Sequence, residues 1–477
     1  MEPTSVPAAQ PAKKLGEGIF FAYGLQEFAM GFLTMLGVQF IGFFLTNVAF
    51  FGVVGGAAIA ATILSVGRFV DIFTVPVVGV IVEKSNLPWG KYGSWLFIMA
   101  PLVTIFTVLM FTDFGLGVNA TAVLITTFYL LMFITINFCS TARFSLLPVF
   151  TKDPDERAKL SIRRAQGAAI GTGIRGFITL PLVVMLGGGA AAHLGGRNTQ
   201  GFVLTALIYG IFTILGLYLI AYLARPYEKK IKEANLQGGP KPATVKDMLR
   251  VLGTNKPLLI FVLANTMTLT ATNVLTGFNL FYFNYVVGSI MLFAFMMPIT
   301  FGGHFVGNTV ATFLVRKYKN NKTVYIIGMI IYAIFMASVY FIAGGRAEVF
   351  IALVAFAQFG NGIAIGLAPA IFSDIADYGE LQVGKSVRAA VMALVIFPIK
   401  IGVFLGGSIA AWALVGIGFV AGTYDPAVIS GIQFWIAIPN AGFGVLAAII
   451  MLAYPLSRSR MQEIHQQLRD KAAAQGN

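Results

Sequence analysis

Six ionisable residues stand inside long apolar runs of this sequence. They are Glu27, Arg68, Asp71, Arg143, Arg175 and Lys400. In hydrocarbon, each charge would cost several kcal/mol unless it faced a partner or a water-accessible cavity. Side chains in such places bind ions, pass protons or hold a polar solute, so their presence predicts a transport pathway.

An enzyme site is not indicated. The histidines His193, His304 and His465 are scattered, and Cys139 is the only cysteine. These residues form neither a nucleophile–base pair nor a metal-ligand cluster, and one cysteine excludes an intramolecular disulfide. We therefore expect no enzymatic activity and no cofactor beyond a coupling ion.

The charged residues recur at one expected depth. Glu27, Asp71 and Lys400 each lie about 10 or 11 residues from the cytoplasmic end of their apolar run, and Arg175 lies 11 residues beyond Arg164. At 1.5 Å per residue this depth is roughly 15–17 Å, about half of the ~30 Å hydrocarbon core. Ser140 falls at a similar level, so we predict a polar site near the bilayer midplane.

Helical spacing groups these residues into stripes. Residues three apart share one helix face, and two sets follow this spacing: Arg68, Asp71 and Thr74, then Asn137, Ser140 and Arg143. Each set is predicted to form a polar stripe along its helix.

Structural alternatives stay open for several of these residues. Asp71 and Lys400, or Asp71 and Arg68, could form a salt bridge that only locks helices together. Arg143 could extend its side chain to the membrane surface. His304 is interpreted as a helix-packing histidine.

The composition places the supporting elements in a membrane. Apolar residues make up 57% and charged residues 11% of the 477 residues, whereas about a quarter of a soluble domain is charged. The length allows about twelve spans of roughly 20 residues. We predict an all-α membrane protein with about twelve transmembrane helices.

The basic residues predict the orientation. Most of the 33 Lys and Arg fall in the tails and in alternate connections, while only Arg197 and Arg346 stand in the remaining ones. Cytoplasmic loops carry the excess of Lys and Arg, so both termini are expected in the cytoplasm. The net charge of +14 is therefore explained by the basic cytoplasmic segments of a membrane protein, and no nucleic-acid partner is expected.

The longest polar connection divides the helices six and six. The predicted parts are an N-tail 1–17, an N-terminal bundle 18–225, a cytoplasmic linker 226–256 with a short amphipathic helix over 243–252, a C-terminal bundle 257–455 and a C-tail 456–477. A weak repeat, GRFVD at 67–71 and GHFVG at 303–307, supports the division. Paired bundles of this kind bind substrate at their interface.

Three motifs resemble a known family. They are RFVDIFTVPVVGVIVEKSNLPWGKYGSW from residue 68, FSLLPVFTKDPDERAKLSIRR from residue 144 and SDIADYGELQVGKSVR from residue 373. They are similar to signatures of the glycoside-pentoside-hexuronide:cation symporters, the melibiose-permease-like branch of the major facilitator superfamily. The resemblance implies a major-facilitator-type fold of two six-helix bundles and sugar symport by alternating access.

The resemblance also implies a cation site. Asp71 matches the family's helix-two aspartate, Thr74 and Asn137 match neighbouring cation-site positions, and Lys400 matches the lysine that links the sugar and cation sites. Val75 replaces a second cation-site aspartate, which weakens the case for Na⁺ because hard cations want several oxygen ligands. The coupling ion is expected to be H⁺ or Na⁺, with Asp71, Thr74 and Asn137 as metal ligands only for Na⁺.

A sugar site follows from the same resemblance. Glu27 matches a helix-one aspartate that binds sugar hydroxyls, Arg164 lies within a residue of a helix-five arginine, and Phe144 stands where the family often has a tryptophan. Ser140 replaces a sugar-binding aspartate. Because four cations face two carboxylates within the spans, Arg175 is expected to help attract an acidic glycoside or sugar acid.

These observations predict a secondary active transporter for a sugar or glycoside. A sodium-dependent lysolipid carrier, known from a related branch, and an uncoupled sugar uniporter remain alternatives. The chain is expected to be a monomer in the lipid bilayer of a cell (inner) membrane, spanning it many times.

Overall fold

The computed structural model describes residues 15–151, 153–188, 199–233, 253, 255–383, 391 and 394–474. Within these ranges the regular secondary structure is helical, and twelve helices are long and apolar enough to cross a membrane. The predicted all-α fold with about twelve spans is confirmed. The predicted helix over 243–252, His193, Arg197 and residues 1–14 of the N-tail lie outside the described residues.

The N-terminal half contains six of the twelve spans. Its first span runs through α1 (Glu17–Met35), a π-helical turn (Leu36–Phe40), α2 (Ile41–Phe44) and a second π-helical turn (Leu45–Ala49). The others are α3 (Gly56–Lys84), α4 (Gly93–Phe111), α5 (Val118–Ser145) with the short α6 (Leu147–Phe150), α7 (Pro154–Leu186) and α8 (Gln200–Glu233).

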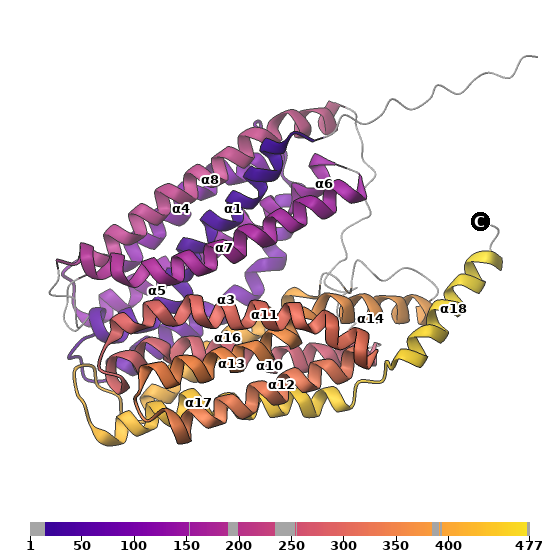
Figure 1. Cartoon of the computed structure of the whole chain (residues 1–477). Helices are drawn as coiled ribbons and strands as arrows, with labels where there is room; N and C mark the ends of the chain where they lie inside the picture. Colours follow the sequence, from indigo (N-terminus) through magenta and orange to yellow (C-terminus); the bar gives the residue numbers. More distant parts are fainter. Residues whose placement is uncertain are drawn as a thin grey trace, which may run out of the picture.

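The C-terminal half contains the other six. They are α10 (Lys256–Phe281) with a π-helical turn (Tyr282–Val286), α11 (Phe293–Tyr318), α12 (Asn321–Ser338), α13 (Ala347–Gly366) continued by α14 (Ala368–Val383), α16 (Ile396–Gly416) and α17 (Pro426–Leu452). The C-terminal α18 (Arg458–Ala474) contacts α14. Figure 1 shows the two halves as two bundles side by side; the residue boundaries of the predicted domains stay a prediction.

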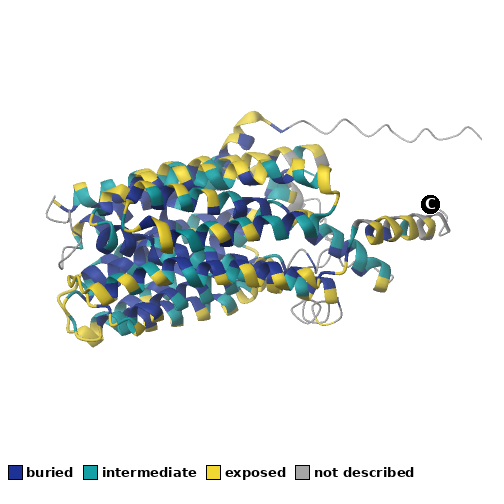
Figure 2. Cartoon of the chain, turned by 60° about the horizontal axis from the view of Figure 1, so that its bottom comes forward, coloured by how far each residue is buried: buried dark blue, intermediate teal, exposed yellow. Residues whose placement is uncertain are grey.

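The outer faces of the helices suit lipid. Buried residues are concentrated between the helices, and exposed ones lie on the outward faces and connections (Figure 2). Large apolar side chains such as Phe177, Phe305 and Phe313 are exposed along the spans. Water-soluble proteins expose this much apolar surface only where they bind a partner. The chain is therefore a multi-pass membrane protein.

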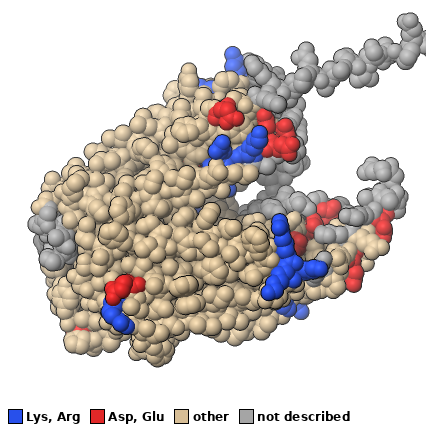
Figure 3. Space-filling model, viewed as in Figure 1, with Lys and Arg blue, Asp and Glu red and all other residues tan. Residues whose placement is uncertain are grey.

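One end of the interface between the halves is closed. The hydroxyl of Tyr285 hydrogen-bonds Asn47 Oδ1 across the two halves and accepts from the backbone N–H of Gly422 at 3.1 Å. Trp412 Nε1 donates to Ser65 Oγ at 3.2 Å nearby. At the opposite end, which carries α6, α14 and α18, a hollow separates the halves (Figure 3). The two ends are called the closed end and the open end below.

Candidate functional site

The first polar cluster joins the two halves. Lys400 Nζ of α16 lies 2.6 Å from Asp71 Oδ2 of α3 and donates to Asn137 Oδ1 of α5 at 3.1 Å. Asn137 Nδ2 donates to Asp71 Oδ1 at 2.7 Å and to Thr74 Oγ1 at 2.8 Å. The carboxylate of Asp71 is buried, with 5% of its side chain exposed, against 18% for Lys400. The four residues form one closed hydrogen-bonded network.

The structure shows which cation pairs with Asp71. Asp71 is paired with Lys400 and not with Arg68, although Arg68 is one helical turn away on the same stripe. The described part of α16 begins at Ile396, and Lys400 is its fifth residue. The depth of Lys400 in the membrane stays a prediction.

The second cluster lies within the N-terminal half. Arg143 of α5 holds Glu27 of α1 with both terminal nitrogens, at 2.8 and 3.5 Å. Only 7% of the Arg143 side chain is exposed. An arginine that reached the membrane surface would be exposed, so the structure contradicts that alternative for Arg143.

An aromatic ring lies beside the second cluster. The guanidinium carbons of Arg143 and Arg164 each lie 4.8 Å from the ring centroid of Phe144. Phe144 keeps 40% of its surface exposed. Cations over a ring face are attracted by the ring quadrupole, so the two arginines fix the ring while leaving part of it free for contact.

Arg175 is held in a niche between α1 and α7. Its Nη2 donates to Thr172 Oγ1 at 2.6 Å, and its Nη1 is buried with no hydrogen-bond partner. A Cβ atom at Gly31 or Gly171 would press on the guanidinium, so these glycines make the niche. No carboxylate lies within 4 Å of Arg175 in the described residues, because Glu27 is taken by Arg143.

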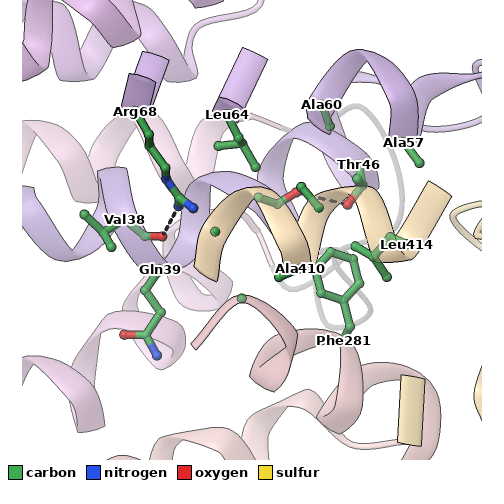
Figure 4. Close-up of a pocket in the computed structure, with 14 residues that line it drawn as sticks. Val38, Gln39, Thr46, Ala57, Ala60, Leu64, Arg68, Phe281, Ala410 and Leu414 are labelled. Carbon is green, nitrogen blue, oxygen red and sulfur yellow. Dashed lines mark hydrogen bonds between the residues drawn. The ribbon is translucent and has the colours of Figure 1, made fainter. Parts of the chain in front are cut away.

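Arg68 is also without a carboxylate in the described part of the chain. Its Nε donates to Tyr129 Oη at 3.3 Å and its Nη2 donates to the Val38 carbonyl at 3.2 Å. The side chain is 6% exposed and borders a cavity between the halves (Figure 4). A Cβ atom at Gly407 of α16 would overlap its Nη1.

The two clusters share one face of α5. Asn137, Ser140 and Arg143 follow each other at three-residue intervals, so the clusters are about 9 Å apart along the helix. Ser140 between them is half-buried. His304 lies apart from both clusters, with its backbone against Gly362 of α13.

Sequence reasoning missed four residues that the structure places at or beside the interface. Asn47 and Tyr285 bond each other across the halves, Gly407 packs against Arg68 across the halves, and Tyr129 accepts from Arg68 within the N-terminal half. These are ordinary polar or small residues of membrane helices, and only their partners distinguish them. Within the described residues, no group of three His, Cys, Asp or Glu residues could hold a metal ion.

Known proteins resemble this chain over nearly its whole length. A model of the family described as MFS/sugar transport protein matches residues 22–458. The isoprimeverose transporter of Lactiplantibacillus pentosus is 25% identical over 95% of this chain and 92% of its own. The glucuronide carrier protein homolog of Escherichia coli is 27% identical over 93% of each chain.

Solved structures share the fold. A D-xylose-proton symporter superposes with a TM-score of 0.66 at 16% identity, covering 93% of this chain and 98% of its own. A nucleoside transporter superposes with a TM-score of 0.64 at 14% identity, covering 92% and 98%. At such identities the likeness concerns the fold alone, and it agrees with the arrangement of two six-helix bundles.

Proposed function

This chain belongs to the MFS/sugar transport protein family, and from that membership we propose that it carries a sugar or glycoside by cation- or proton-coupled symport. The observation that carries the proposal is the ion pair between Asp71 and Lys400. This ion pair joins α3 of one bundle to α16 of the other.

Coupling follows from the chemistry of this pair. A proton or cation that neutralises Asp71 removes the attraction for Lys400, and the contact between α3 and α16 weakens. The Lys400 ammonium is then free to contact substrate, which favours substrate binding. Rocking of the bundles exposes the substrate site to the other side of the membrane. Such coupling is reciprocal, so substrate raises the affinity for the coupling ion by the same factor.

The coupling ion is H⁺ or Na⁺ in this proposal. For Na⁺, oxygen ligands are available from Asp71, Thr74 and Asn137, but Lys400 must leave first because its ammonium lies against Asp71 Oδ2 and Asn137 Oδ1. Val75 supplies no second carboxylate. A proton needs only Asp71, which favours H⁺.

The substrate site in this proposal lies along α5 and the facing helices. Glu27, Arg164 and Ser140 hydrogen-bond hydroxyl groups, and Phe144 stacks against the ring. Arg175, with its free Nη1, favours an acidic sugar. The name of one relative, a glucuronide carrier protein homolog, agrees with an acidic substrate. Stacking and bidentate arginine contacts suit such ligands.

The orientation belongs to the same proposal. With both termini in the cytoplasm of a cell (inner) membrane, the open end faces the cytoplasm and the state is inward-facing. We take the functional unit to be a monomer in the bilayer, without enzymatic activity, nucleic-acid partner or cofactor other than the coupling ion.

Uptake into membrane vesicles tests the proposal. Vesicles with an imposed pH or Na⁺ gradient should concentrate a labelled glycoside, and Asp71→Asn should abolish accumulation. Asp113→Asn, in an exposed connection, is the matched control and should accumulate normally. If Asp71→Asn still concentrates the glycoside, the coupling role is wrong. Gradient-independent flux would instead identify a uniporter, and uptake of labelled lysolipid but not glycoside would identify a lipid carrier.

A further inference from the structure

Arg68 is a buried cation that the transport proposal does not use. Its two printed acceptors, the Tyr129 hydroxyl and the Val38 carbonyl, are neutral groups. Its remaining terminal nitrogen, Nη1, has no acceptor in the described residues and lies against Gly407. The guanidinium is therefore held in place without being neutralised.

The nearest acidic residue on its helix is already engaged. Asp71 gives one carboxylate oxygen to Lys400 and the other to Asn137. Arg68, Asp71 and Lys400 together thus carry one net positive charge in a buried part of the interface. Breaking or omitting the partner of a buried charge typically costs several kcal/mol, so an additional negative charge is expected close to Arg68.

A cavity beside Arg68 provides the place for it. Fourteen residues from both halves line this cavity, and Arg68 is the charged one among them (Figure 4). Small residues leave the space, including Gly42 of α2, Gly277 of α10 and Gly407 of α16. The enclosed part has room for roughly one or two water-sized species. A sugar does not fit there, whereas a halide ion does.

We propose that this cavity binds a small monovalent inorganic anion, such as chloride, against Arg68. The walls come from α1–α2, α3, α10 and α16, so the site is complete only while the closed end is closed. The anion therefore stabilises this state and is released when α3 and α16 separate. The proposal is independent of the sugar site, because it concerns a different cavity and a different ligand.

Thermal unfolding of the purified full-length protein tests the site. Replacing gluconate by chloride at constant ionic strength should raise the apparent Tm by roughly 1–2 °C at ten times the dissociation constant. Arg68→Gln should lose this dependence. Arg346→Gln, an exposed arginine in a connection, should keep it. A Tm that does not respond to chloride in the unmodified protein overturns the proposal.

A second measurement locates the anion. Crystals grown or soaked with bromide should show an anomalous peak beside Arg68 in the unmodified protein and none in Arg68→Gln. A peak at another position, or a peak in the cavity without any chloride response in solution, overturns the proposal as well. Because Arg68→Gln can be less stable for other reasons, the decisive quantity is the difference between chloride and gluconate within each variant.

Discussion

Replacing Gly407 by alanine should destabilise the conformation in which the closed end is closed. Gly407 of α16 faces Arg68 of α3, and an added Cβ would overlap the guanidinium Nη1. The guanidinium can move only by giving up its hydrogen bonds to Tyr129 and to the Val38 carbonyl. We expect this overpacking to cost about 1–3 kcal/mol. The cost applies only to the conformation in which α3 and α16 are in contact.

This cost changes the equilibrium between the two conformations of the transporter. A penalty of 1–3 kcal/mol on one state shifts the equilibrium by about 5- to 150-fold toward the other. Gly407→Ala should therefore populate the outward-open state, slow transport and expose residues of the closed interface. Gly416→Ala, on the same helix with open space around its Cβ, should behave like the unmodified protein.

Cysteine labelling from the outside measures the shift. The native Cys139 is buried and should be silent, so Ala411→Cys in the cavity wall can serve as the reporter. A membrane-impermeant maleimide should label it at least about 5-fold faster when Gly407→Ala is added. Adding Arg68→Ala should return the rate toward its original value. An unchanged labelling rate in Gly407→Ala would refute the packing argument.

Three further predictions concern the two polar clusters. Lys400→Ala leaves the Asp71 carboxylate buried without its cation and should cost about 3 kcal/mol of stability; in thermal unfolding the double variant with Asp71→Asn should be less destabilised than Lys400→Ala alone. Phe144→Ala should weaken sugar binding about 2- to 30-fold in calorimetry, whereas Phe144→Trp should retain it, because tryptophan preserves the ring between two arginines. Arg175→Gln should lower the affinity for an acidic sugar by about tenfold or more while sparing the matching neutral sugar; equal losses for both sugars would contradict a role in charge recognition.

Several features could be predicted because they are local properties of the chain. The apolar runs predict twelve spans, since hydrophobicity over about 20 residues decides whether a segment enters lipid. The stripes on α3 and α5 follow from helical spacing alone. The family was also identified from motifs that run continuously in the sequence, and the match over residues 22–458 confirms it.

The pairing of the charges was decided only by the tertiary structure. The apolar runs of the sequence contain four cations and two carboxylates, and the sequence left open whether Asp71 pairs with Arg68 or with Lys400, which is 329 residues away. Packing of α3 against α16 makes that choice. The ion pair between α5 and α1 gives Glu27 to Arg143 and leaves Arg175 without a carboxylate among the described residues. Helical periodicity predicts which face of a helix is polar. Which segment packs against that face depends on contacts between parts of the chain that are far apart in sequence.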